Sequence, residues 1–326
     1  MLTPVRGSLR LARRGFVSFA LLATVLAGAA QAQLLRPAID GLVLDSARAQ
    51  AYAMNETGGI DALDLSTGAV AWSTQAAVKP LVKVDGLLLA QATSEKANVL
   101  ALAILDDTGT LRALTEVALP EGVQVASRDG LGQMFRLHLV AVEGKQVTLG
   151  WTALSYPASG LRLKSPTLSA SSSRPSEGAI VVDLAGARAS VIPAEQAANL
   201  LANPPGAVAA EIALAASGPR TFLATDGAAR LVSTLNEDAT TPLTRYRWTI
   251  FNAQGAVAGG VEHAVSSAPF VLAGSSLVYV EQPTGRLVGD VVERMPLSLI
   301  SVDLATGAEL WQRELVDTRY HGPFPP

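Results

Sequence analysis

The chain has 326 residues, of which 49% are hydrophobic and 16% are charged, a composition that argues against disorder and allows a large buried core. It contains no cysteine, so disulfides, thiolate chemistry, cysteine metal sites and a lipid anchor on cysteine are excluded. The first 32 residues hold four of the 25 basic residues and no acidic one, so 21 basic and 28 acidic side chains remain, a net charge of −7. This charge disfavours nucleic acid as a partner.

Residues 1–32 are expected to be a cleaved export signal. An arginine-bearing start precedes an apolar run from Phe16 to Ala30, and the small residues Ala30 and Ala32 follow, which is the organisation of a secretory leader. We predict cleavage before Gln33 and a periplasmic or secreted protein. An uncleaved anchor is the less favoured alternative, because the apolar run is shorter than the roughly 20 residues that span a membrane.

The export route has two alternatives. Residues 13–17 read RRGFV, which resembles the twin-arginine export motif, although the flanking Ala12 and Ser18 depart from it. The ordinary secretory route is the favoured one.

Two segments at opposite ends of the mature chain repeat one pattern. Residues 60–72 read IDALDLSTGAVAW and residues 300–311 read ISVDLATGAELW. Both contain Asp-Leu-x-Thr-Gly with a tryptophan four residues after the glycine. Apolar residues on both sides of the Thr-Gly pair predict two antiparallel strands joined by a tight hairpin, with glycine at the position that needs a positive φ.

This pattern resembles the tryptophan-docking repeat of the pyrroloquinoline-quinone-type (PQQ-type) β-propellers. In that family the tryptophan of one blade packs against the glycine peptide of its neighbour, so the resemblance implies a structural role in blade docking. The matching residues are Ala62, Asp64, Gly68 and Trp72 in the first copy and Ser301, Asp303, Gly307 and Trp311 in the second.

Weaker copies of the repeat are expected between these two. We place outer-hairpin turns at Gly109, Gly144, Gly186 and Gly255. Most intervals between successive turns lie near the roughly 40 to 45 residues of a four-stranded blade. The predicted fold is therefore all-β, a β-propeller of four-stranded antiparallel blades, about seven in number with six or eight as alternatives, in a single domain over 33–326. The predicted units are 36–78, 79–119, 120–157, 158–200, 201–218, 219–266 and 267–316.

One short helix is expected from Pro193 to Asn203, because proline suits the first turn and the residues after it favour a helix. With a preceding Ser/Pro-rich loop it would form an insertion over 165–205. Ser171, Ser172 and Arg174 are candidate binding residues in that loop, and a tolerated loop without function is the alternative. The Pro-rich tail, 317–326, is expected to be extended.

The sequence contains no recognisable catalytic motif, neither a phosphate-binding loop nor a nucleophile elbow nor a zinc-binding helix. His138, His263 and His321 lie far apart. The pairs Asp106-Asp107 and Glu237-Asp238 could act in acid–base chemistry, but both lie in predicted turns, where acidic residues set turn geometry. No catalytic, cofactor-binding or metal-binding residue is predicted.

The resemblance implies two classes of function. Quinoprotein dehydrogenases with this repeat bind PQQ and calcium on the propeller axis, and a degenerate enzyme of that kind, with its site at the axial funnel, is the alternative. This chain departs from their pattern because it is shorter and lacks both cysteine and an Asp, Asn and Glu cluster for calcium. It is more similar in size to the non-catalytic propellers that assist outer-membrane protein assembly. We therefore predict an exported, non-catalytic scaffold without a cofactor that binds an envelope protein or another macromolecule and is not an integral membrane protein.

Overall fold

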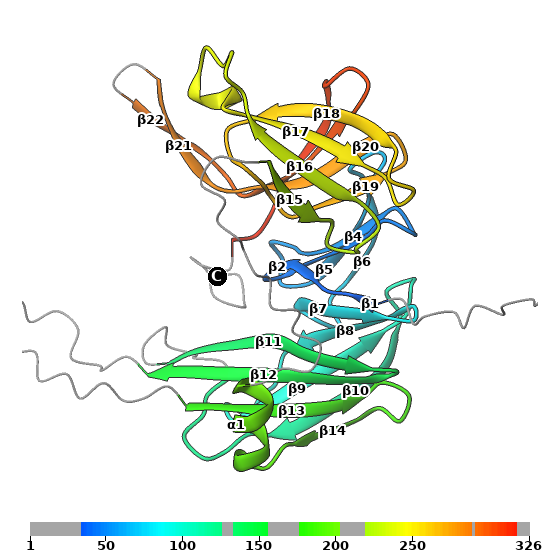
Figure 1. Ribbon diagram of the computed structural model, residues 1–326. Coiled ribbons are helices and arrows are strands. Elements are labelled where there is room, and N and C mark those ends of the chain that lie inside the picture. Colours follow the sequence, from blue (N-terminus) through cyan, green and yellow to red (C-terminus); the bar gives the residue numbers. More distant parts are fainter. Residues whose placement is uncertain (1–33, 126–132, 156–175, 203–218, 289–290, 318–326) are drawn as a thin grey trace, which may run out of the picture. The chain divides into compact units, whose positions relative to one another are not determined.

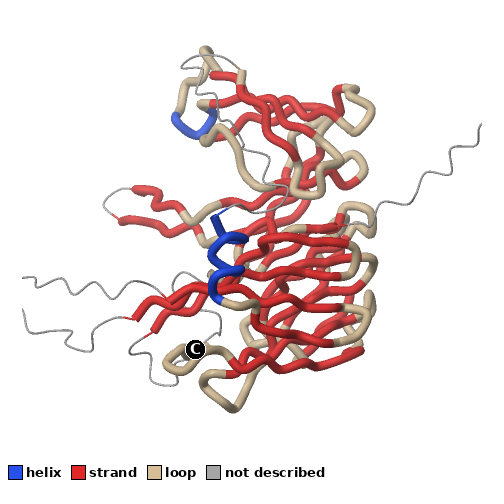
Figure 2. The backbone as a smooth tube through the Cα atoms, turned by 60° about the horizontal axis from the view of Figure 1, so that its bottom comes forward, coloured by secondary structure: helices blue, strands red, loops and turns tan. Residues whose placement is uncertain are grey.

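The computed structural model describes residues 34–125, 133–155, 176–202, 219–288 and 291–317. These residues form an all-β fold (Figures 1 and 2) with five sheets of four or five antiparallel strands, one two-stranded hairpin and one α-helix. Within each sheet the strands follow one another in chain order, apart from the added β1 and the hairpin inserted in the last sheet. This succession of antiparallel meanders is a β-propeller, as predicted.

The sheets are numbered in chain order. Sheet 1 contains β2 (Pro37–Ile39), β3 (Leu42–Asp45), β4 (Gln50–Met54), β5 (Ile60–Asp64) and β6 (Val70–Thr74). Sheet 2 contains β1 (Leu34–Leu35), β7 (Lys79–Val84), β8 (Leu87–Ala92), β9 (Val99–Leu105) and β10 (Leu111–Ala118). Sheet 3 contains β11 (Gln133–Glu143), β12 (Gln146–Ser155), β13 (Ser176–Asp183) and β14 (Arg188–Val191).

The remaining elements complete the fold. Sheet 4 contains β15 (Arg220–Leu223), β16 (Arg230–Leu235), β17 (Tyr246–Phe251) and β18 (Val257–His263). Sheet 5 contains β19 (Phe270–Ala273), β20 (Ser276–Glu281), β23 (Ser298–Asp303) and β24 (Glu309–Glu314), with the hairpin β21 (Thr284–Val288) and β22 (Val291–Met295) between β20 and β23. The helices are α1 (Ala194–Ala202), which confirms the predicted helix, and the short 3-10 helix η1 (Pro242–Thr244).

The predicted units 120–157 and 158–200 are wrong as separate blades, because β12 pairs with β13 along eight residues and joins them in one sheet. The cause is Gly144, which turns β11 into β12 instead of forming an outer hairpin. The described residues therefore contain five blade-like sheets, against seven predicted units. Unit 201–218 lies almost entirely outside the described residues, as do the leader and the tail from residue 318 onward.

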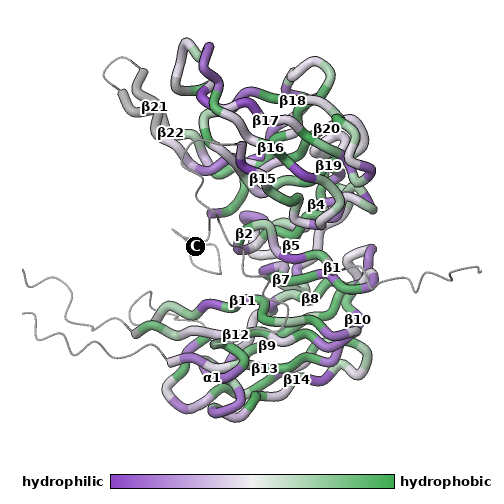
Figure 3. Tube along the Cα trace, in the orientation of Figure 1, coloured by the Kyte–Doolittle hydropathy of each residue, from purple (hydrophilic) through white to green (hydrophobic). Residues whose placement is uncertain are grey.

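The burial of each strand explains its composition. Strand β9 is apolar throughout and all seven of its residues are buried, which is typical of a strand covered on both faces. The outermost strands β10 and β24 are largely exposed and mix apolar with polar and charged residues. Figure 3 colours the chain by hydropathy. Sheets therefore bury their inner strands between neighbouring sheets and expose their last strands.

Four clusters of buried side chains join the sheets in pairs. Separate clusters link sheets 1 and 2, sheets 2 and 3, sheets 1 and 5, and sheets 4 and 5. On the remaining face of sheet 3 lies α1, where the side chain of Leu201 packs against Gly150 and Ala197 is buried. Sheets 1, 2 and 5 are thus covered on both faces by other sheets, and sheet 3 by a sheet and a helix.

Two tryptophans join neighbouring sheets through glycine. The indole of Trp72 in sheet 1 lies against Gly109 in the β9–β10 turn, and its Nε1 donates to the carbonyl oxygen of Asp107 at 3.0 Å. Likewise Trp311 in sheet 5 lies against Gly68 in sheet 1, and its Nε1 donates to the oxygen of Leu65 at 3.1 Å. The second contact joins the last sheet to the first.

Small residues and aspartates complete these docking hairpins. Ala62 and Ser301, which face Trp72 and Trp311 across the strands, are fully buried. Asp303 accepts hydrogen bonds from the turn at Thr306, and these bonds lower its pKa. Hydrogen bonds from Ser66 likewise lower the pKa of Asp64, and hydrogen bonds from Thr108 lower the pKa of Asp106 to about 2.

Two buried lysines of β7 bind acidic residues that belong to sheet 1. The Lys83 ammonium lies 2.8 Å from the Asp45 carboxylate, which is fully buried, and also contacts the hydroxyl of Tyr52 and, at 2.8 Å, Asp107. Burial alone would lower the pKa of Lys83, but the hydrogen bonds to these three groups outweigh it and the pKa is raised. Lys79, equally buried, pairs with the half-exposed Asp40 at 2.5 Å.

A first prediction uses the matched glycines Gly68 and Gly307. Both have φ +71°, but a Cβ at Gly68 would lie 2.8 Å from the Trp311 indole, whereas Gly307 has open space. Alanine at Gly307 should destabilise by about 1–2 kcal/mol from backbone strain alone. Alanine at Gly68 should cost about 1–3 kcal/mol more, because the indole must also move. Denaturant unfolding of both variants measures the difference, and equal losses would contradict the docking contact.

A second prediction compares the two lysines of β7. Lys83→Met removes the ammonium that pairs with the buried Asp45 and should destabilise by about 3–5 kcal/mol. Lys79→Met leaves only the half-exposed Asp40, which water can solvate, so its cost should stay below about 1 kcal/mol. Denaturant midpoints for both variants measure the contrast. A loss for Lys83→Met no larger than that for Lys79→Met would show that this network does not stabilise the contact between sheets 1 and 2.

Candidate functional site at the edge of sheet 4

The two acidic pairs lie in separate turns. Asp106 binds its own turn and Arg112, whereas Asp107 pairs with Arg48 at 2.6 Å and with Lys83. Glu237 and Asp238 lie in the turn after β16, as predicted.

The two histidines in the described residues, His138 and His263, lie in different sheets. His138 lies on β11 and faces Gly150 of β12. His263 ends β18, and His321 lies outside the described residues, as do the candidate loop residues Ser171, Ser172 and Arg174. In the described ranges no group of three or more acidic or histidine side chains could hold a metal ion.

Sheet 4 differs from sheets 1 and 5 at the position of the docking tryptophan. Counting four residues past the hairpin glycine gives Trp72 after Gly68, but Gly259 after Gly255. The backbone at Gly259, with φ +154°, lies directly against the carbonyl of Leu304 in sheet 5. Leu304 follows Asp303 just as Leu65, the acceptor of the Trp311 indole, follows Asp64. A close backbone approach thus replaces the indole between sheets 4 and 5.

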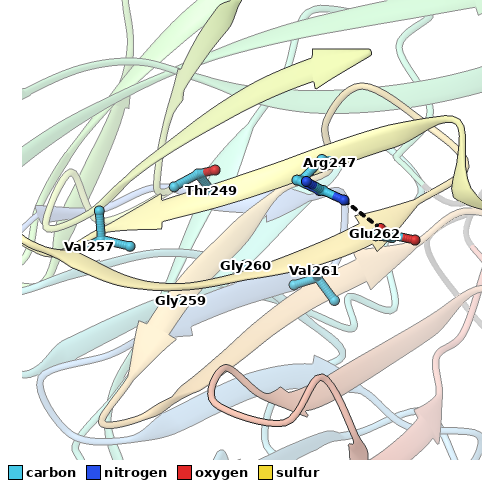
Figure 4. A pocket seen from close by; sticks show the side chains of 7 residues that line it. All are labelled: Arg247, Thr249, Val257, Gly259, Gly260, Val261 and Glu262. Atoms are coloured by element: carbon cyan, nitrogen blue, oxygen red, sulfur yellow. Dashed lines mark hydrogen bonds and ion pairs between the residues drawn. The ribbon is translucent and has the colours of Figure 1, made fainter. Parts of the chain in front are cut away.

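A shallow hollow of about 380 Å³ follows the outer strands of sheet 4 (Figure 4). Consecutive residues of β18 line it together with side chains of β17, so the hollow runs along the backbone of β18. At one end Arg247 pairs with Glu262 at 3.1 Å, and both side chains are about half exposed. The lining residues are Arg247, Thr249, Val257, Gly259, Gly260, Val261 and Glu262.

The C-terminal end of β18 is held by an aromatic contact within sheet 4 and by polar and aromatic contacts with sheet 5. His263 stacks on Trp248 with ring centroids 4.2 Å apart, and its Nε2 lies 2.7 Å from a carboxylate oxygen of Glu281. Its Nδ1 accepts the backbone N–H of Val265 at 3.2 Å, so Nε2 carries the proton that Glu281 accepts. Burial raises the pKa of the neighbouring Tyr279 hydroxyl.

The face of sheet 4 turned away from sheet 5 is open. Among the described residues no core cluster covers it. One row crosses all four strands and ends in side chains that are 72% and 62% exposed, and its arginine lies over an aromatic ring at 4.4 Å. The row reads Leu223, Arg230, Phe251 and Val257. Exposed apolar side chains beside a free strand edge are typical of an interaction surface.

Sequence reasoning did not identify this site. The signal available was the absence of a tryptophan four residues after Gly255, together with two consecutive glycines in a strand, Gly259 and Gly260. Glycine inside a strand often marks a close backbone approach, which is the role of Gly259.

The sequence matches no family model and no curated protein. Solved structures similar to this chain include BamB from Moraxella catarrhalis, with 11% identity, 83% of this chain and 62% of that chain covered, and a TM-score of 0.27. A lignostilbene dioxygenase from Pseudomonas brassicacearum has 11% identity, coverage of 83% and 68%, and a TM-score of 0.26. The β-propeller domain of Cps50 (Swd1) from Myceliophteria thermophila has 12% identity, coverage of 84% and 85%, and a TM-score of 0.26.

Similarity at this level concerns the fold alone. The chain spans less than two thirds of the BamB chain that it matches. In the part of the chain that the structure describes, no helix is long and apolar enough to cross a membrane.

A third prediction concerns Gly259. Alanine there would place its Cβ in the Leu304 backbone, which cannot move without shifting the hairpin of sheet 5. We expect a loss of about 3 kcal/mol or more from strain and overpacking together. Gly255→Ala is the control, because its φ is also positive at +78° but its Cβ meets open space, so only the strain of about 1–2 kcal/mol should remain. Similar melting temperatures for the two variants would contradict the contact between Gly259 and Leu304.

Proposed function

We propose that this chain is an exported, non-catalytic β-propeller of the PQQ-like type that binds another protein of the cell envelope through sheet 4. The observation that carries the proposal is that, among the residues the structure describes, no strand pairs with the outer edge of β18. This edge adjoins the exposed row from Leu223 to Val257 and the hollow beside it. Surfaces of this kind on a rigid β scaffold are suited to recognising a protein.

The relation to PQQ-type propellers is supported by the two docking hairpins. Each has the Asp-Leu-x-Thr-Gly sequence and, four residues after its glycine, a tryptophan that packs on a glycine of a neighbouring sheet, Trp72 on Gly109 and Trp311 on Gly68. The shared arrangement concerns packing, so it supports kinship of fold and gives no reason to assign a cofactor.

Export is supported by the leader alone. An arginine-bearing start, an apolar run and Ala30-Gln31-Ala32 lie directly before Leu34, which opens the first strand. Leu34 and Leu35 pair with Val84 and Lys83 of sheet 2, so cleavage before Gln33 would leave a mature chain whose first residues enter a sheet.

The fourth prediction tests partner binding. Expressed with its leader, the chain should begin at Gln33 by intact mass and should leave the envelope fraction as a complex with one stoichiometric partner. Val257→Lys should abolish that complex, because it places a charge on the exposed edge of β18. Light scattering and native mass spectrometry after gentle extraction measure the complex.

Leu310→Lys on the outer strand of sheet 5 is the matched control, since Leu310 is also about half exposed. Both variants should melt as the wild type does, and only Val257→Lys should lose the partner. A chain that stays monomeric and reduces a dye when supplied with PQQ, Ca²⁺ and an alcohol would overturn the proposal in favour of a quinoprotein-like enzyme.

A further inference from the structure

We infer that the partner contributes an extended segment that pairs with β18 as an added strand, with a bulky apolar side chain opposite Gly260 and a basic side chain opposite Glu262. This inference rests on the proposed function and specifies how it is carried out. Strand addition to a free sheet edge supplies affinity through backbone hydrogen bonds and specificity through alternate side chains.

In the described residues the outer edge of β18 has no paired strand, because β18 is the terminal strand of sheet 4. Exposed edges are usually protected by charged side chains, and β10, β14 and β24 carry them. In β18 the one acidic residue is Glu262 near the C-terminal end, and residues 257–261 carry no charge. β6 is uncharged too, but its Trp72 is fixed against sheet 2.

Contacts within the protein hold β18 in place before a partner binds. β18 pairs with β17 from Val257 to His263, with a β-bulge at Ala258. Its middle lies against Leu304 at Gly259, and its end is held by the stacking of His263 on Trp248 and by Glu281. A rigid edge loses little conformational entropy on binding, which favours recognition of a flexible segment.

An added strand would have room for a large side chain opposite Gly260. Gly260 pairs with Thr249 of β17, and both line the hollow together with the exposed Val257. An added strand would direct alternate side chains to this face of the sheet. Because Gly260 has no side chain and Thr249 is short, the position across from Gly260 has room for a large apolar group.

The charge of Glu262 favours a basic side chain on an added strand. Glu262 lies two residues after Gly260 and therefore on the same face, and Arg247 occupies its inner side at 3.1 Å. Its outer side faces the free edge, where a cross-strand Lys or Arg would pair with it. The net charge of −7 on residues 33–326 also draws a basic segment and repels an acidic one.

The fifth prediction uses a symmetric peptide probe, fluorescein-labelled Thr-Lys-Thr-Phe-Thr-Lys-Thr, which places a lysine two residues from phenylalanine in either strand direction. Fluorescence anisotropy should show saturable binding to the full chain, and replacing both lysines by glutamate should weaken it at least about fivefold. Amide hydrogen exchange should show new protection confined to residues 257–263.

The decisive variant is the double swap Arg247→Glu/Glu262→Arg, which keeps both the internal ion pair and the net charge. It should reverse the preference, so that the glutamate peptide binds more tightly than the lysine peptide. Leu310→Lys on β24 should leave binding of the lysine peptide unchanged.

Three results would overturn the inference. They are no binding at millimolar peptide, an unchanged preference in the double swap, and, in the free chain, protection of those amides of 257–263 that do not pair with β17, which would mean that the edge is already occupied. If the partner complex of the fourth prediction forms and is insensitive to the double swap, partner binding stands and strand addition at β18 falls.

Discussion

The contact on which this fold depends is the indole of Trp311 resting on the peptide of Gly68. It joins the last sheet to the first, and its hydrogen bond to Leu65 spans nearly the whole described chain. Without this contact, the packing between sheets 1 and 5 would lose its most specific interaction. Only glycine allows this contact, because the turn needs a positive φ and a Cβ would collide with the ring. The absence of a side chain at Gly68 therefore helps to join the first and last sheets.

The other sheets reach their neighbours by different means, and the differences account for the site. At the tryptophan position sheet 2 has Ala113, which packs on the apolar cluster shared with sheet 3. Sheet 4 has Gly259, and its backbone approaches Leu304 directly. Between sheets 1 and 2 the indole is reinforced by the buried ion pairs of Lys79 and Lys83. At Gly259 the outer strand of sheet 4 therefore lacks the large side chain that β6 and β24 direct at a neighbouring sheet.

The sequence was most informative where structure is local. Asp64, Gly68 and Trp72 predicted a hairpin and a docking indole, because turn geometry and spacing are encoded within a few residues. Gly144 misled the division into blades, since a Thr-Gly-like turn has the same signal whether it joins the first two strands of a sheet or the last two. The site could not be predicted in the same way. It is defined by side chains that are absent and by the contact of Gly259 with Leu304, which depends on how two sheets pack.

The edge of β18 also raises the question of why such a strand would not aggregate. Pairing between two copies would bring together two chains that each carry a net charge of −7 after the leader, with Glu262 near both edges. Coulomb repulsion of this kind keeps like chains apart while favouring an oppositely charged segment. On β18 a single local charge, Glu262, adds to the net negative charge of residues 33–326. This combination would disfavour pairing between two copies and favour the basic segment that we propose.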